Sequence, residues 1–170
     1  MKILIPVLIG LSVMGCGKKD DTNIGAVKPD LPLPKVTPVK LIEDPDLELA
    51  IRFSLKKSTG TLTEYDLRKV TELDLGNNKM TELPMGLEKL TKLERLHFYA
   101  NQLTDVKGLE ELTQLKYLSL WNNQLSDLIG LEKLIALEEL NIEYNPDLTK
   151  ALIDELQKAL PNCEIIHNAK

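Results

Sequence analysis

The sequence predicts an α/β solenoid in which short parallel strands form a concave sheet. Three observations predict it. A pattern of apolar residues and asparagine recurs every 22 or 23 residues through the second half of the chain. Within each unit, apolar and polar residues alternate as in a strand that is buried on one face. Aromatic residues make up only 4% of the chain, so the expected core is aliphatic.

Residues 1–15 have the layout of a secretory signal peptide. A lysine precedes an apolar run of twelve residues, residues 3–14, and a glycine stands before Cys16. Such a run is too short to cross a bilayer as a helix. A buried first helix is the alternative interpretation. It is disfavoured because Pro6 interrupts the run and a charged, proline-rich stretch follows it.

Residues 13–16, Val-Met-Gly-Cys, resemble the lipobox of bacterial lipoproteins. In that motif the cysteine is acylated and becomes the first residue of the mature chain. The resemblance implies that lipidation of Cys16 anchors the protein to a membrane. One acyl chain binds a membrane only marginally, whereas several chains give stable anchoring.

Two short signals bear on which membrane holds the anchor. Gly17 stands where an aspartate retains some lipoproteins at the inner membrane. Residues 18–21, Lys-Lys-Asp-Asp, resemble the lysine and acidic-pair signal of surface lipoproteins in some bacteria. The sequence therefore favours an exported protein at the outer membrane or the cell surface over one at the inner membrane.

Residues 16–40 combine the lipidated Cys16 with a proline-rich tether. Four prolines fall between residues 29 and 38, a composition that favours extended polyproline geometry and cannot pack a core. At about 3.1 Å per residue, the residues after Cys16 could span about 75 Å at most. We expect this segment to hold the domain away from the membrane.

Residues 41–69 are expected to form a helical N-terminal cap. Asp44, followed by a proline, begins a helix, and residues 58–60 are expected to end it. Residues 63–66 predict a capping box for a second short helix, in which Leu67 faces inward. A cap is needed because an open solenoid end would expose apolar side chains and an unpaired strand edge.

Residues 70–148 fit the template LxxLxLxxNxL four times. The fitting positions are Val70, Leu73, Leu75, Asn78 and Met80; Leu93, Leu96, Phe98, Asn101 and Leu103; Leu115, Leu118, Leu120, Asn123 and Leu125; and Leu137, Leu140, Ile142 and Asn145. A Gly-Leu pair also recurs in the second half of the first three units. This is the leucine-rich-repeat pattern.

The domain resembles small bacterial leucine-rich-repeat proteins of the 22-residue type, with the helical N-terminal cap of internalin-like proteins. The resemblance implies a short right-handed array with a parallel concave sheet, and a family that usually binds other proteins. Each template asparagine is expected to bond backbone groups of neighbouring turns. This structural asparagine ladder is predicted to contain Asn78, Asn101, Asn123 and Asn145.

Residues 149–170 are expected to form a helix-strand C-terminal cap. Thr149 caps the predicted helix. The residues expected on its inward face are Leu152, Leu156 and Leu160. Cys163 and Ile166 then fit the first and fourth template positions. The apolar setting of Cys163 predicts a small buried hydrophobic residue rather than a disulfide partner.

The outward strand positions three, five and seven are expected to form the concave face. The predicted ligand-binding residues are Arg95, His97, Tyr99, Tyr117, Ser119, Trp121, Asn141 and Glu143. Three of the chain's seven aromatic residues lie in this set, and Tyr144 stands beside it. Aromatic side chains gathered on one face favour recognition, although cross-strand rings also cover a sheet without any ligand.

These patterns predict a monomeric, membrane-tethered module for protein–protein interaction in the bacterial cell envelope. Acidic side chains around the aromatic patch favour a neutral to basic protein or peptide partner. Glycan binding and a structural envelope spacer are the alternatives. A net charge of −5 without a basic run argues against nucleic acid.

No enzyme activity is expected. Position five of adjacent strands reads Asp74, His97 and Ser119, a hydrolase-like set whose spacing would allow hydrogen bonds, but on an open face. No cofactor is expected, and Glu139 and Glu143 lie too far apart along one strand to share a metal ion. His167 is expected to be solvated near the end of the chain.

Overall fold

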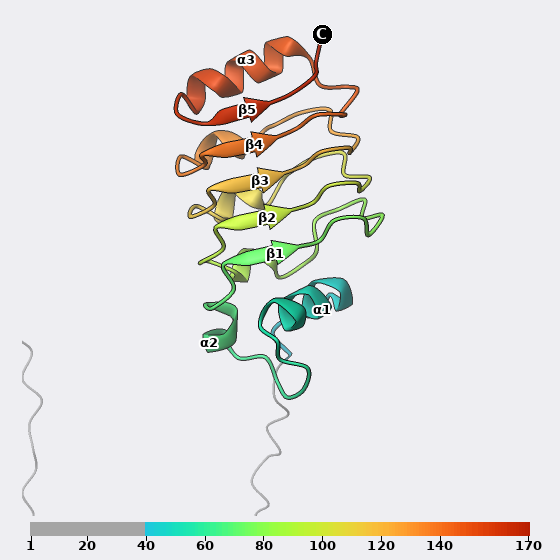
Figure 1. Ribbon diagram of the computed structural model, residues 1–170, viewed down its shortest axis with the longest axis vertical. Coiled ribbons are helices and arrows are strands. Elements are labelled where there is room, and N and C mark those ends of the chain that lie inside the picture. Colours follow the sequence, from blue (N-terminus) through green and yellow to red (C-terminus); the bar gives the residue numbers. More distant parts are fainter. Residues whose placement is uncertain (1–39) are drawn as a thin grey trace, which may run out of the picture. The chain divides into compact units, whose positions relative to one another are not determined.

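The computed structural model describes residues 40–170, which form one solenoid unit; the predicted signal peptide, Cys16 and most of the tether lie outside this range. Five parallel strands form one sheet in chain order (Figure 1). The strands are β1 (Glu72–Asp74), β2 (Arg95–His97), β3 (Tyr117–Ser119), β4 (Glu139–Asn141) and β5 (Glu164–Ile166). The predicted fold class, a short leucine-rich-repeat solenoid with a concave parallel sheet, is confirmed.

Helix α1 (Pro45–Ser54) covers the β1 end of the array (Figure 1). The Asp44 carboxylate caps it and accepts hydrogen bonds from the backbone N–H groups of Asp46 and Leu47, at 3.0 and 2.9 Å. The predicted start is therefore confirmed. The predicted end at residues 58–60 is wrong, since Lys56 takes a left-handed conformation with φ 52° and turns the chain earlier.

Helix α1 seals the array with both apolar and polar contacts. Leu47 and Ile51 are fully buried and face the first repeat. The Ser54 hydroxyl donates to the backbone carbonyl oxygen of Glu72 at 2.8 Å, which satisfies an acceptor on the edge strand β1.

Helix α2 (Glu64–Leu67) follows as a single turn with the predicted capping box. The Thr63 hydroxyl accepts from the backbone N–H of Asp66, and the Asp66 carboxylate accepts from the backbone N–H of Thr63. Leu67 is buried as predicted. Lys57 and Thr63 hold the pKa of the Asp66 carboxyl well below its ordinary value, so this turn favours the ionised carboxylate.

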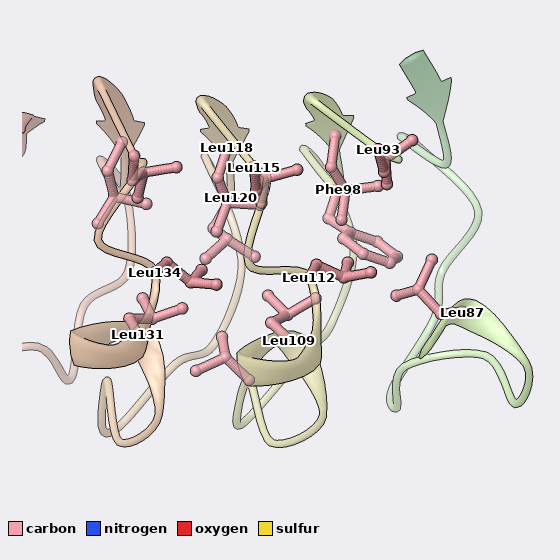
Figure 2. Close-up of a cluster of buried hydrophobic side chains, with 14 of the residues drawn as sticks. Leu87, Leu93, Phe98, Leu109, Leu112, Leu115, Leu118, Leu120, Leu131 and Leu134 are labelled. Atoms are coloured by element: carbon pink, nitrogen blue, oxygen red, sulfur yellow. The ribbon is translucent and has the colours of Figure 1, made fainter. Parts of the chain in front are cut away.

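The repeats stack in register, so equivalent side chains lie beside one another. Leu73, Leu96 and Leu118 pair across the first three strands, and Leu140 continues the column. Figure 2 shows leucines of the strands facing leucines of the return turns. Phe98 is the one aromatic side chain in the buried core of residues 40–170, which confirms the aliphatic core.

Each of the first three return halves contains one turn of 3₁₀ helix. These turns are η1 (Leu87–Lys89), η2 (Leu109–Glu111) and η3 (Leu131–Lys133). A glycine with positive φ precedes each turn, at Gly86, Gly108 and Gly130, with φ of 99°, 108° and 99°. The recurring glycine is required because side chains disfavour this conformation.

A buried asparagine ties each later repeat to the one before it. The side-chain amide of Asn123 donates to the carbonyl oxygens of Phe98 and Leu120, at 2.9 and 3.0 Å, and its oxygen accepts from the N–H of Leu103 at 3.0 Å. Asn101 and Asn145 make the equivalent bonds. The ladder therefore links each repeat to the one before it and also closes the turn of its own repeat.

Asn78 does not belong to this ladder, and the prediction for it is wrong. Its side chain is exposed and makes no hydrogen bond within residues 40–170, while its backbone N–H donates to Asn101 Oδ1 at 3.1 Å. The physical reason is its place in the array. Asn78 belongs to the first repeat, so helix α1 stands where the preceding strand would offer carbonyl groups.

Helix α3 (Lys150–Ala159) and strand β5 close the other end (Figure 1). Thr149 caps α3 as predicted, accepting from the N–H of Leu152 at 3.4 Å. The inward face differs from the prediction. Ile153, Leu156 and Leu160 are buried, whereas Leu152 is only half-buried at the rim of the core.

Strand β5 is shifted by one residue from the predicted register. Ile165 pairs with Leu140 at the fourth template position, and Ile166 pairs with Asn141 at the fifth. The prediction for Ile166 is therefore wrong, because the link that follows α3 places only one residue between Cys163 and the inward strand position. His167 is half-buried rather than solvated, and its Nδ1 atom is buried with no hydrogen-bond partner among residues 40–170.

Cys163 is a free thiol buried in the C-terminal cap, as predicted. Burial raises the pKa of this thiol from 9.0 to about 11, and the carboxylates of Glu139 and Glu164 add to the effect. A buried neutral thiol is a poor nucleophile.

No helix in the part of the chain described is long and apolar enough to cross a membrane.

Candidate functional site: the concave face

The concave face is built by the outward positions of strands β1 to β4 and the residues just after them. Alternation places the side chains at positions three, five and seven on this side, because positions four and six are buried. The strands are only three residues long, so each repeat contributes a short row. The side chains in these rows therefore determine what the surface can bind.

A first group of rings forms around Tyr117, and we name it the Tyr117 cluster. It comprises Arg95, His97, Tyr99 and Tyr117. The Arg95 guanidinium lies over the Tyr117 ring, 4.4 Å from its centroid, and the His97 ring lies 5.0 Å from that ring. Tyr99 meets His97 edge to face, with centroids 6.4 Å apart. These contacts join β2 to β3.

A second group, the Trp121 pair, lies towards the C-terminal side of the sheet. The rings of Trp121 and Tyr144 meet edge to face with centroids 5.6 Å apart and an interplanar angle of 72°. Tyr144 is exposed and has a positive φ of 57°, a conformation that turns the chain directly after β4. The aromatic patch therefore consists of two packed groups rather than separate rings.

Tyr99 also has a role inside the fold. Its ring lies over Gly76, at the equivalent position of the previous repeat, so closely that a Cβ atom at residue 76 would come within 2.4 Å of the ring. The glycine therefore makes room for the ring, which covers the chain just after β1. Pairing of a small and a large residue across strands was not apparent from the sequence.

Charges surround the two groups unevenly. Glu72 lies near two cationic or titratable groups, 4.0 Å from Arg95 Nε and 3.7 Å from His97 Nε2. Glu139 and Glu143 on the other side form none of the ion pairs found within residues 40–170. Glu143 lies beside the Trp121 pair and Glu139 lies opposite Tyr117, so both aromatic groups have an adjacent carboxylate on the β4 side, which favours a partner that brings positive charge.

Ser119 does not contribute contact area, which corrects the predicted ligand-binding set. Its side chain is 5% exposed, because it is short and stands between the larger residues His97 and Asn141 across the sheet. Its neighbours along the strand are Tyr117 and Trp121. The other seven predicted residues are at least partly exposed.

The geometry also bears on the hydrolase alternative. Asp74, His97 and Ser119 stand in register on adjacent strands as predicted. The expected hydrogen bonds between them are not made within the described residues. The Asp74 carboxylate accepts from the N–H of Gly76 at 2.8 Å instead, and His97 Nε2 faces Glu72. A buried Ser119 hydroxyl offers no approach to a substrate.

Asn141, another predicted binding residue, stabilises the local backbone. The side-chain oxygen of Asn141 accepts from the N–H of Glu143 at 3.1 Å, which fixes the chain as it leaves β4. Within residues 40–170, no group of three or more His, Cys, Asp or Glu side chains could hold a metal ion.

One recurring hydrogen bond in the return halves was not predicted from the sequence. Glu88, Glu110 and Glu132 each accept a hydrogen bond from the N–H of the glycine two residues earlier. The signal was present as a Gly-Leu-Glu triplet in each return half. These contacts lie away from the strands and stabilise the turns, so they do not extend the concave site.

The model of the family described as Leucine Rich repeats (2 copies) matches residues 68–111 and 113–162, which together make up more than half of the chain. The chain belongs to the leucine-rich-repeat family. No curated protein sequence matches it. Leucine-rich-repeat proteins stack their units into extended concave surfaces that bind other molecules, so this fold is typical of protein-interaction modules.

Three solved structures are similar to this leucine-rich-repeat chain. An internalin C2 of Listeria monocytogenes shares 24% identity over 76% of this chain, with a TM-score of 0.63. Another internalin of that organism shares 22% identity over 81%, with a TM-score of 0.59. A leucine-rich-repeat protein of Leptospira interrogans shares 34% identity over 62%, with a TM-score of 0.54. The chain spans 58%, 48% and 28% of their respective lengths.

Proposed function

We propose that this protein is a membrane-tethered interaction module of the bacterial cell envelope, which binds a protein or peptide through its concave face. The observation that carries the proposal is the pair of aromatic groups on that face, the Tyr117 cluster and the Trp121 pair. Large rings supply contact area at low entropic cost. The aliphatic core does not need them there, since Phe98 is the one ring it contains among residues 40–170.

The partner is expected to be neutral to basic. Glu143 lies beside the Trp121 pair and Glu139 pairs across the sheet with Tyr117, and neither forms an ion pair in the described part of the chain; Glu72 and Asp74 lie on the other side. Complementary charge speeds association and selects among partners more than it raises affinity. Four short strands offer a small surface compared with the roughly 800 Å² per partner of a standard interface. Binding is therefore expected to be weak unless neighbouring loops add contacts.

The tether is supported by sequence alone. The apolar run of residues 3–14, the lipobox ending at Cys16 and the proline-rich segment up to residue 40 form the order expected of an exported lipoprotein. Attachment to a surface raises the local concentration of the binding face, which offsets a low intrinsic affinity. Mass spectrometry of the mature chain tests this part: an acylated Cys16 supports it, and an unmodified residue contradicts it.

The binding face is tested with Trp121→Ala and Tyr117→Ala in the full chain. Both variants are expected to lose capture of a partner by about tenfold or more, because centrally placed aromatic residues dominate interface energies. The matched control is Lys107→Ala, which changes an exposed residue in a return half. Melting temperatures should stay close to that of the unaltered chain. Large losses of stability with unchanged capture would show that the rings only cover the sheet.

Glycan binding is the second candidate, favoured by the exposed edge of the Trp121 pair. Tryptophan and tyrosine rings stack on sugars as they do on other apolar faces. Titration with envelope glycans while the emission of Trp121 is followed separates the two candidates, because Trp121 is the only tryptophan in the chain. A saturable change would support glycan binding, and a flat response would leave the protein partner.

A further inference from the structure

The N-terminal end of the solenoid carries an apolar surface that the fold does not use. Phe53 is 85% exposed and Leu49 is 68% exposed, and they lie one turn apart on α1. Leu47 and Ile51 are buried on the opposite side of the same helix. The two exposed side chains therefore point away from the repeats. Neighbouring large apolar residues that are both mainly exposed mark a surface for interaction with another molecule or a membrane.

Cations surround this apolar pair, which we name the α1 end face. A shallow groove of about 510 Å³ is lined by Leu49, Phe53, Arg52, Lys56, Lys57 and Ser58. Arg52 is paired with Glu48 at 2.8 Å and Lys57 with Asp66 at 2.7 Å. Lys56 is exposed and forms none of the ion pairs within residues 40–170. An exposed apolar pair beside an exposed ammonium group matches the headgroup region of a bilayer.

The charge of the chain is distributed along the solenoid. Residues 40–69 contain six basic and six acidic residues, whereas residues 70–170 contain ten basic and seventeen acidic residues. An anionic membrane surface repels the acidic repeats and tolerates the neutral cap. Electrostatics therefore favours an arrangement in which the cap end faces the bilayer.

The chain also enters the domain at this end. The Lys40 ammonium pairs with Glu48 of α1 at 2.9 Å, so the described part of the chain begins on the helix that carries Phe53. A surface placed next to its own attachment point meets the membrane at high local concentration. Even two side chains then suffice for frequent contact.

We propose that the α1 end face docks on the phospholipid bilayer to which the protein is tethered, with Leu49 and Phe53 at the boundary between headgroups and acyl chains. This inference rests on the proposed anchor at Cys16. It departs from the expectation that the tether holds the domain away from the membrane, because the extended length of about 75 Å is the largest separation and not a fixed one. In the docked state the N-terminal cap contacts the membrane and the repeats extend away from it. The concave face then points along the plane of the membrane, not towards the lipid. The concave face is then accessible to partners in the same layer of the envelope.

The test places a single indole in the α1 end face of the acylated full chain. Phe53→Trp combined with Trp121→Phe is reconstituted in vesicles of phosphatidylethanolamine and phosphatidylglycerol that contain a nitroxide-labelled lipid. Its emission is expected to shift to the blue and to fall by about half through contact with the label. The matched control is Ile135→Trp with Trp121→Phe, at a residue that is 83% exposed in the third repeat. The control is expected to show neither change.

Failure of docking and failure of the anchor give different results. A chain that stays on vesicles while the indole at residue 53 is unquenched overturns docking and leaves the anchor intact. Equal quenching of both indoles, or dimerisation in solution that Phe53→Asp abolishes, also overturns it. If Cys16 proves unmodified, the same two variants carrying Cys16→Ser are measured with excess vesicles. Selective quenching at residue 53 then supports docking without the anchor.

Discussion

The first and third repeats follow the same template but differ in what holds them. Asn123 of the third repeat is buried and bonds carbonyl and N–H groups of the second repeat. Asn78 occupies the equivalent position in the first repeat, yet its side chain is exposed. At position seven, the third repeat carries Trp121 and the first carries Gly76, which lies under the Tyr99 ring.

This difference separates two kinds of template position. The asparagine stabilises the interface between repeats, so its contribution depends on having a repeat before it. Outward positions are less constrained by the stacking, although Gly76 must leave room for the Tyr99 ring, and their residues vary from glycine to tryptophan. A residue at an outward position is consequently a better guide to function than one at an inward position.

The largest effect expected from this comparison is on the asparagines. Asn123→Ala leaves backbone groups of Phe98, Leu103 and Leu120 without partners in a buried site, so the free energy of unfolding should fall by about 1–3 kcal/mol. Asn78→Ala should change it by about 0.5 kcal/mol or less, as exposed substitutions do. Denaturant melts of both variants measure the difference. Equal losses would contradict the account of the ladder.

A smaller effect is expected at Gly76. Gly76→Ala places a methyl group where the Tyr99 ring lies, so the ring must move, at a cost of about 1 kcal/mol. The same substitution in a Tyr99→Ala background should cost almost nothing. A double-mutant cycle measured by chemical denaturation gives the coupling between the two residues. Coupling near zero would show that the ring does not depend on the glycine.

In the C-terminal cap, the Cys163 thiol is expected to make the free energy of unfolding depend on pH. Its pKa is raised from 9.0 to about 11 in the folded chain. Below pH 9 the thiol is neutral in both states, and between pH 9 and 11 ionisation favours the unfolded chain, so stability falls as pH rises. Cys163→Ala should lose part of this decline in denaturant melts. An identical decline in both proteins would contradict the burial of the thiol.

Most of the fold was predictable because stacked repeats obey local rules. The spacing of Leu73, Leu96 and Leu118 indicated the strands and their register, and the helix starts at Asp44 and Thr149 followed from capping chemistry. What failed lay at the two ends. Asn78 and the strand containing Ile166 depart from the template, because a cap replaces a neighbouring repeat.

The sequence predicted which residues lie on the concave face, but it did not predict how exposed each of their side chains is. Alternation placed Tyr117 and Trp121 outward, whereas the exposure of each side chain depends on its neighbours across the sheet. Ser119 is buried between longer residues, and Tyr99 leans over Gly76. These outcomes arise from contacts between residues about 22 positions apart, which the pattern of a single strand does not contain.

The central claim is that the concave face binds a partner, and site-directed photo-crosslinking in intact cells tests it most directly. A photoreactive phenylalanine derivative, which keeps an aromatic ring, replaces Trp121 in one full-length variant and Lys107, an exposed return-half residue, in another. Our account predicts that the variant altered at Trp121 is joined to a defined partner and that the variant altered at Lys107 is not. Equal crosslinking at both positions, or crosslinking only at Lys107, would contradict it.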